Sequence, residues 1–481
     1  KILYPDGINI MKYYYYNSWT ILHQIIAVLI KLNFSNVLIS RIIIFFSTLF
    51  FVVGIYLITK AITNNKIFSI FLSLFIVIFK KNFGAVEYGT AMFSIHTYGM
   101  ISLALTTLIL GTNALKNLNL SIFFSFLLIT IHPVVGSWIF LMHVISLIVY
   151  NYFEEKKLSF KEIKLGFFGG IIVLGSSLFI FNIYYLQPID NNYLSNFDVY
   201  LKYWDIHRDI STQTNLKYFF KTLILVILIF YFFYEAKKKN KRIEYFIYFI
   251  TINIVASVLI YITYKQFHYL LPKFFLQVMP ARFVILYSVV GWPIIISIIY
   301  LLYKKIIKSH EFKYEFFFLL LIFIILSRSE MIKKDFNSFK NLLTNNIQSD
   351  DKSFWYQVSN KNDLMVLTTS SIVYDVTRKG FKPIILDTSS FDFIPYHPHT
   401  VNLLKEIIEQ IYGVPFDKPP IKSFAYLPDE IIKLNFQKKT KLEWYKISKK
   451  FEFNSIIVPS NWKISLSPVL ESKNYSLYIL Y

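Results

Sequence analysis

Apolar segments recur along the first two thirds of the chain, and this pattern changes near Ser327. Residues 39–58, for example, contain a single charged side chain, Arg41. A run of about 20 apolar residues is long enough to cross the hydrocarbon core of a bilayer. Beyond Ser327 polar and apolar positions are mixed, as in domains that fold in water. The pattern predicts an α-helical multi-pass membrane protein that carries a water-exposed C-terminal domain.

Charged or Pro/Gly-containing breaks divide the apolar part into about ten spans. The predicted spans are 38–59, 67–79, 98–111, 119–131, 135–151, 165–183, 217–234, 245–262, 283–303 and 314–327. Three of them, 67–79, 98–111 and 119–131, are shorter than a full crossing requires. We expect these short spans to be tilted, re-entrant or shielded by neighbouring helices.

The C-terminal part shows alternating strand and helix signals. Residues 364–369, 383–387, 456–459 and 475–481 are typical of strands. Apolar residues at helical spacing in 401–412, followed by Gly413, predict a helix that ends at this glycine. Strands that alternate with helices favour a small α/β domain.

Composition supports the membrane assignment, since 55% of the 481 residues are hydrophobic and only 16% are charged. A net charge of +21 raises the question of nucleic-acid binding, but the lysines do not gather on an amphipathic or aromatic-interleaved stretch. We therefore expect no nucleic-acid partner. The absence of cysteine excludes disulfides and thiolate chemistry. Lysine far exceeds arginine, and Ile, Asn, Phe and Tyr are abundant, which is typical of an AT-rich bacterial genome.

Basic residues in short loops predict the orientation, because such loops stay in the cytoplasm. The loops 60–66, 112–118, 152–165, 235–244 and 304–315 hold 16 basic residues, whereas the alternate loops 80–97, 132–134, 184–216 and 264–282 hold 7. The first set is therefore assigned to the cytoplasm. The predicted organisation is an external segment with an interfacial helix (1–37), a transmembrane helical domain (38–327) and an extracytoplasmic α/β domain (328–481).

Polar residues that map to the outer ends of the spans are the candidates for chemistry, because metal, nucleophile and phosphate-loop motifs are absent from the sequence. A lipid phosphate at this depth would pair with Arg or Lys, and a carboxylate would act as a general base or hold a divalent cation. The expected catalytic residues are Asp6 and Glu87, and the expected substrate-binding residues are His96, His132, Arg208, His268, Lys273 and Arg282. We also predict that Arg282 and at least one of the two carboxylates line a single external cavity.

Three of these candidates also have a structural explanation. Asp6 lies in a Pro-Asp-Gly sequence that is an ordinary turn signal. His132 precedes Pro133 at a predicted helix start, where a structural role is the more frequent one. Arg282 could equally anchor a helix end at the lipid head groups. In the C-terminal domain, Arg378 and Asp387 more often form a stabilising pair than a site.

The layout resembles that of the GT-C-type membrane glycosyltransferases. The resemblance is carried by Ile2-Leu3-Tyr4-Pro5-Asp6, by Tyr13 to Thr20 and by Ile131-His132-Pro133-Val134-Val135-Gly136. The C-terminal segments 367–371, 377–381, 384–387 and 393–396 are similar to those of uncharacterised bacterial multispanning proteins. The resemblance implies a catalytic acidic residue in the first external loop, for which Asp6 is the match.

Together these observations favour a transferase in the bacterial cytoplasmic membrane that takes sugar from a polyprenyl-phosphate carrier at the outer face. Two alternatives remain open: a non-enzymatic assembly or glycan-binding protein, and a transporter. Transport is disfavoured because the predicted spans contain almost no ionisable residues. No metal ligand set is predicted, and the lipid bilayer is the one certain partner.

Overall fold

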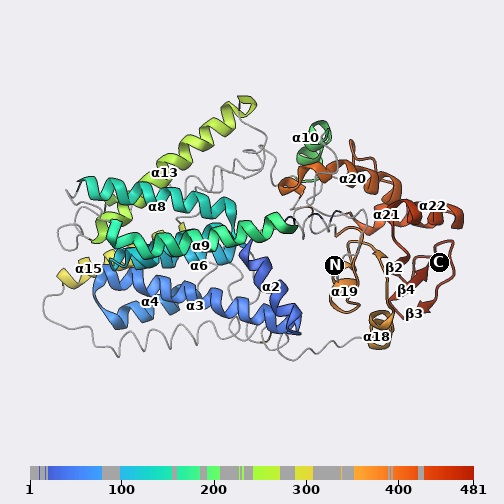
Figure 1. Ribbon diagram of the computed structural model, residues 1–481, viewed down its shortest axis with the longest axis horizontal. Coiled ribbons are helices and arrows are strands. Elements are labelled where there is room, and N and C mark those ends of the chain that lie inside the picture. The colour runs from blue at the N-terminus through green and yellow to red at the C-terminus, as the bar shows by residue number, and fades with distance from the viewer. Residues whose placement is uncertain are drawn as a thin grey trace. The chain divides into compact units, whose positions relative to one another are not determined.

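The computed structural model describes residues 20–78, 98–153, 160–184, 192–205, 242–270, 288–306, 351–387, 394–420 and 427–480, together with a few single residues such as Ile10, Tyr13 and Asn17. The chain forms two compact units (Figure 1). One unit comprises residues 19–182 and 214–345. The other comprises residues 1–18, 183–213 and 346–481, which come from three separate parts of the chain.

The first unit is a helical bundle. Its helices are α2 (Ile21–Lys31), α3 (Asn36–Thr63), α4 (Lys66–Ile78), α6 (Tyr98–Ala114), α7 (Leu118–Ile131), α8 (Pro133–Phe153), α9 (Phe160–Tyr184), α13 (Arg242–Gln266) and α15 (Ser288–Ile306), with a short 3₁₀ turn, η1 (His268–Leu270). Helix α6 packs against α3 and α7, and α8 packs against α7 and α13. One continuous apolar core joins these helices.

Local sequence explains where these helices begin and end. Ser35 caps α3 by accepting a hydrogen bond from the Leu38 amide, and α3 ends where Asn64 takes the left-handed conformation. Asn117 caps α7 in the same way. Helix α8 begins with Pro133, whose fixed φ suits the first helical position.

Glycines allow two pairs of helices to approach closely. A Cβ at Gly54 of α3 would lie 2.1 Å from the Thr107 side chain of α6. A Cβ at Gly166 of α9 would lie 2.0 Å from the backbone oxygen of Asn119 in α7. Small residues at such contacts are typical of helix packing in membranes.

Three helices among the described residues are long and apolar enough to cross a membrane: Val37–Thr63, Pro133–Phe153 and Phe160–Ile183. The predicted span 314–327 lies outside the described residues, and so does most of 217–234. The described parts of the other predicted spans are helical. Helix α9 carries large apolar side chains on its outer surface, including Leu165 and Phe179, which are 76% and 68% exposed. The helical class and a small C-terminal sheet are confirmed, whereas the expected number of about ten spans is not.

The second unit is an α/β domain. Its elements are α10 (Leu194–Tyr203), α18 (Lys352–Asn360), β1 (Val366–Leu367), α19 (Val373–Arg378), η4 (Pro398–Thr400), α20 (Val401–Glu406), which continues as the π-helical turn η5 (Ile407–Tyr412), α21 (Asp429–Lys438), α22 (Lys441–Phe451), β2 (Ser455–Pro459), β3 (Leu470–Glu471) and β4 (Tyr475–Ile479). As predicted, the helix of 401–412 ends at Gly413, whose φ of 68° favours glycine.

The sheet has the strand order β1-β2-β4-β3. Strands β1 and β2 are parallel, β4 is antiparallel to both β2 and β3, and Ile384 forms a parallel bridge to Val366. Residues from α18 and α19 cover one face, and residues from α10, α20, η5, α21 and α22 cover the other. The domain therefore has three layers, with apolar cores on both sides of a short mixed sheet.

Candidate functional site

Most of the predicted site residues lie outside the described residues: Asp6, Glu87, His96, Arg208, Lys273 and Arg282. The predicted cavity shared by Arg282 and a carboxylate therefore stays a prediction. For His268 the structure gives the backbone position, which is the first residue of η1.

His132 lies at the junction of two helices. Its backbone ends α7, and its carbonyl accepts a hydrogen bond from the Gly136 amide at 2.7 Å. Its Nδ1 atom accepts a long hydrogen bond of 3.5 Å from the Val135 amide in the first turn of α8. These contacts favour the helix-start explanation for His132 over a ligand role.

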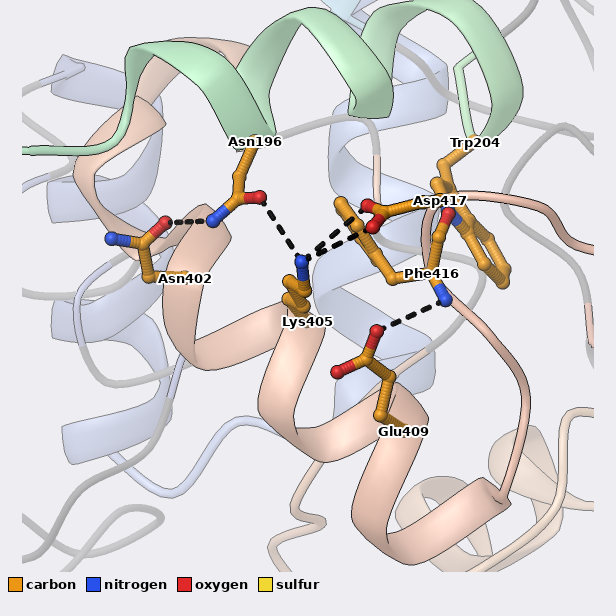
Figure 2. Close-up of polar contacts among 7 residues, drawn as sticks. All are labelled: Asn196, Trp204, Asn402, Lys405, Glu409, Phe416 and Asp417. Atoms are coloured by element: carbon orange, nitrogen blue, oxygen red, sulfur yellow. Dashed lines mark hydrogen bonds and ion pairs between the residues drawn. The ribbon is translucent and has the colours of Figure 1, made fainter.

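The loop between two predicted spans contributes a helix, α10, to the α/β domain (Figure 2). The amide of Asn196 donates to the Asn402 Oδ1 atom at 2.8 Å, and Lys405 Nζ lies 3.4 Å from Asn196 Oδ1. Lys405 also forms an ion pair with Asp417 at 3.4 Å. A line of polar contacts thus joins α10 to α20 and to the segment that follows η5.

Large side chains of α10 and of Trp204, the residue that follows it, lie in the core of the domain. Phe197, Tyr200 and Trp204 are at most 1% exposed and belong to the same core as β2 and α20. Trp204 Nε1 donates to the Phe416 carbonyl at 2.9 Å, and the two rings are stacked with centroids 5.7 Å apart. Ile10, from the N-terminal segment, belongs to this core as well. Helix α10 is therefore an integral part of the domain.

The carboxyl edge of strand β1 carries the hydroxyl-rich sequence Thr368-Thr369-Ser370-Ser371. Parallel strands of α/β sheets present their ligands at this edge. Here, however, the protein itself uses several of these groups: Tyr412 donates to the Thr368 carbonyl at 3.1 Å, and Ser371 donates to Asp429 Oδ2 at 2.6 Å. Burial raises the pKa of Asp429, although the hydrogen bond from Ser371 partly opposes this shift. This loop mainly fixes α21 and η5 to the sheet.

A second group of side chains lies at the same edge, on the face covered by α18 and α19. We call it the edge cluster; its members are Asp351, Trp355, Asp375, Lys379, Asn474 and Tyr475. Asp351 precedes α18, Asp375 lies in the first turn of α19, and Tyr475 is the first residue of β4, opposite the end of β2. The topology of the sheet therefore gathers residues more than 100 positions apart.

Hydrogen bonds and an ion pair connect the edge cluster. The Tyr475 hydroxyl donates to Asp375 Oδ2 at 2.6 Å, and Lys379 Nζ lies 2.9 Å from Asp375 Oδ1. The amide of Asn474 donates to Asp351 Oδ2 at 2.8 Å. The ring centroids of Trp355 and Tyr475 are 4.9 Å apart. These contacts hold the two carboxylates, the lysine and the aromatic pair in one place.

Two groups of the edge cluster, Asp351 and Tyr475, have shifted pKa values. Burial pushes the pKa of Asp351 up, but hydrogen bonds from Ser472 and Asn474 and the charge of Lys379 outweigh burial and leave the pKa below its ordinary value. Burial, the hydrogen bond to Asp375 and the nearby negative charges all raise the pKa of Tyr475.

A buried polar network crosses the helical bundle. His143 Nδ1 contacts the Tyr245 hydroxyl, and His143 Nε2 lies 2.8 Å from Ser121 Oγ, which in turn donates to the Ile109 carbonyl at 2.9 Å. Since the single Ser121 proton goes to Ile109, His143 Nε2 carries a proton and Nδ1 accepts from Tyr245. The network joins α6, α7, α8 and α13 through satisfied hydrogen bonds, so it stabilises their packing.

Sequence reasoning missed His143, the edge cluster and α10. For His143 a signal existed, since it is an ionisable residue in the middle of an apolar span. Among the described residues no group of three or more His, Cys, Asp and Glu side chains could hold a metal ion. Comparison of the sequence with protein-family models and with curated proteins finds no match.

Proposed function

We propose that this protein is an integral membrane glycosyltransferase of the GT-C type that uses a polyprenyl-phosphate-linked sugar at the outer face of a bacterial cytoplasmic membrane. The observation that supports the proposal is the composition of the α/β domain. Residues 1–18, the inter-span segment 183–213 and the C-terminal part form one compact unit. A transferase of this layout needs its external loops assembled beside the bilayer, where the lipid carrier presents its phosphate.

The domain also constrains the threading of the chain. Segments that fold into one water-exposed domain lie on the same side of the membrane, because loops that are not paired internally do not reside in hydrocarbon. The chain must then cross an even number of times between Asn17 and Asn192, and again between Asp205 and Asp351. The predicted threading meets both conditions, with six spans in the first interval and four in the second.

The requirement for an even number of crossings also concerns the short helices. Among the described residues of the first interval, three helices are long and apolar enough to cross, α3, α8 and α9, and three is an odd number. If these three helices all cross, an even total requires a further crossing, and we assign it to one of the shorter helices of the interval. This supports the expectation that short helices take part in the bundle, shielded by their neighbours.

In the proposed reaction, Asp6 or Glu87 accepts the proton of the acceptor hydroxyl. Arg208, Lys273 and Arg282 pair with the phosphate oxygens of the carrier, and His96 and His268 line the substrate groove. Attack of the acceptor oxygen on the sugar carbon breaks the bond to the phosphate, and the carrier phosphate leaves with the bonding electron pair.

A transfer assay tests this proposal. The full-length protein in vesicles is incubated with polyprenyl-phosphate-linked radiolabelled sugar and an extract of envelope acceptors, and loss of label from the lipid is measured. We expect transfer by the wild type, at least a 100-fold loss in Asp6→Asn or in Glu87→Gln, and little effect of Asp198→Asn on α10. Equal rates with wild-type protein and with empty vesicles would contradict the proposal.

The alternative is a glycan-binding or envelope-assembly protein without catalysis. The presence of a polar cluster at the ligand-binding edge of the sheet favours this alternative over transport. The one ionisable side chain in the middle of a described span, His143, is fully engaged by Tyr245 and Ser121. If the protein binds saccharide but leaves the lipid-linked sugar intact, the result supports this non-catalytic alternative.

A further inference from the structure

Exposed lysine and leucine side chains gather on two helices of the α/β domain, α21 and α22. Residues 438–450, which end α21 and form most of α22, contain six lysines and a single acidic residue, Glu443. Such a concentration of one charge on adjoining helices creates a local positive potential.

Leu442 lies at the centre of the exposed side of α22. The buried residues of this helix are Trp444, Ser448 and Phe451. Lys446 and Lys449 follow Leu442 by four and seven residues, so the three share the side of the helix opposite the buried one. Leu442 is 64% exposed, and both lysines are exposed. Helix α22 is thus amphipathic, and the expectation that the lysines do not gather on such a stretch is wrong for this segment.

Helix α21 extends this exposed side. Leu434 is 60% exposed, and Lys438, four residues later, is exposed on the same side of its helix. The Phe436 and Trp444 rings lie edge to face with centroids 5.2 Å apart, so the two helices pack against each other. We call the exposed group the leucine–lysine surface; its members are Leu434, Lys438, Leu442, Lys446 and Lys449.

Local contacts fix the helix that presents most of this surface. Thr440 and Glu443 form a capping box at the start of α22, in which the Thr440 amide donates to Glu443 Oε2 at 2.6 Å. Lys450, near the other end, forms an ion pair with Glu406 at 2.7 Å. The exposed leucine and lysines are therefore presented by an ordered helix, so a partner need not fold α22 on binding.

The same face of the domain receives most of the chain connections from the helical bundle. The chain passes between the two units at residues 18–19, 182–183, 213–214 and 345–346. Ile10 and α10, which are the domain parts nearest in sequence to the first three of these points, pack in the same core as α21 and α22. Helix α18, which follows the fourth point, covers the opposite face of the sheet.

The chemistry of the leucine–lysine surface selects an anionic bilayer as its partner. Lysines near a bilayer are attracted to the phosphates of anionic lipids. Exposed leucines among the lysines gain by entering the boundary between head groups and acyl chains, whereas a soluble polyanion offers them no apolar phase. The chain carries helices long and apolar enough to cross a membrane, so a bilayer is always at high effective concentration around the domain.

We propose that the leucine–lysine surface docks the α/β domain onto an anionic bilayer, with Leu434 and Leu442 at the acyl boundary and the lysines on lipid phosphates. The proposal rests on the α/β domain and on the membrane helices, and it does not depend on the transferase proposal. Docking holds the domain against the lipid surface, in either an enzyme or an assembly protein.

Quenching of a fluorescent label by spin-labelled lipids tests this docking. The chain has no cysteine, so Leu442→Cys takes a single bimane label. The full-length protein is reconstituted in vesicles of equal parts phosphatidylcholine and phosphatidylglycerol, with a nitroxide lipid added. We expect strong quenching in these vesicles. Quenching should be weaker in phosphatidylcholine alone and at about 1 M salt, where the Debye length falls to about 3 Å.

A label on the opposite face of the sheet is the positional control. Tyr374 of α19 is 53% exposed, and α19 packs on the other side of the sheet from α22. The bimane label of Tyr374→Cys should remain in water in both kinds of vesicle.

Charge variants of the protein labelled at position 442 test the role of the lysines. Lys446→Gln/Lys449→Gln should lower the ratio of docked to undocked protein about 30-fold, from the usual attraction of two lysines to an anionic surface. Lys352→Gln/Arg378→Gln is the matched control. It also removes two exposed positive charges, but from α18 and α19, and should leave the ratio unchanged.

Three results would overturn the proposal. The first is a label at position 442 that stays unquenched in the anionic vesicles, including the case in which a fluorescent oligonucleotide binds this surface instead. The second is quenching at position 374 and not at 442, which would place the opposite face on the bilayer. The third is a wild-type ratio in Lys446→Gln/Lys449→Gln. Intact docking without sugar transfer would reject only the transferase proposal, so the two failures are distinguishable.

Discussion

Truncation of Trp204 to alanine should destabilise the whole α/β domain, although Trp204 lies far in sequence from the strands. Removing a buried aromatic side chain costs about 3–5 kcal/mol. Trp204 is 1% exposed, and the change also leaves the Phe416 carbonyl without its indole donor. A loss of about 4 kcal/mol reduces the folding equilibrium constant about 1,000-fold. This is a large share of the 5–15 kcal/mol that stabilises a typical domain.

Hydrogen exchange of the full-length protein measures this effect. Amides of β2, at residues 455–459, should exchange about 1,000-fold faster in Trp204→Ala if the domain opens as one unit. Trp204→Phe keeps an aromatic ring in the core and should cause a smaller change. Trp138→Ala is the control, since Trp138 is buried in the helical bundle and donates to Asn253. Exchange of β2 in Trp204→Ala within threefold of wild type would refute the view that α10 belongs to the domain.

Two further predictions concern packing and pH. Gly166→Ala should destabilise the contact of α9 with α7 by about 1–3 kcal/mol, since a Cβ has no room beside Asn119. Gly175→Ala should be neutral, because its Cβ would meet nothing within 4 Å. Thermal unfolding in detergent compares the two variants. Burial raises the pKa of Asp429 above its ordinary value of 3.8, so ionised Asp429 destabilises the folded domain at neutral pH. This destabilisation disappears as the pH falls through the raised pKa and Asp429 takes up a proton. Asp429→Asn should therefore raise the melting temperature of the domain at pH 7 and lose this advantage below pH 3.8; a lower melting temperature at pH 7 would contradict it.

The elements that sequence predicts well here are those defined by local pattern. The apolar runs of 38–59, 135–151 and 165–183 became helices of crossing length, since length and hydropathy alone decide that outcome. The strands at 456–459 and 475–481 and the helix end at Gly413 follow from short-range propensity and turn chemistry.

The features that the sequence did not predict, α10 in the domain core and the edge cluster, depend on contacts between residues far apart in the chain. Nothing local shows that Phe197, Tyr200 and Trp204 insert into a core formed some 200 residues later. The edge cluster is equally hidden, because Asp351 and Tyr475 meet only when α18 and β4 are placed on the same sheet. Residues such as Asp6 and Glu87 were accessible to reasoning from loop position and resemblance, and their roles remain predictions.

We propose that the domain to which Ile10, α10 and the C-terminal part belong lies outside the cytoplasm. The chain has no cysteine, so single cysteines at exposed positions 198 and 378 can be labelled with a membrane-impermeant maleimide in intact cells, with position 239 as the cytoplasmic control. The account predicts labelling of 198 and 378 in intact cells and of 239 only after permeabilisation. If positions 198 and 378 are labelled from opposite sides, they do not share a domain. If both are labelled only after permeabilisation, the domain lies in the cytoplasm and the proposed outer-face transferase is excluded.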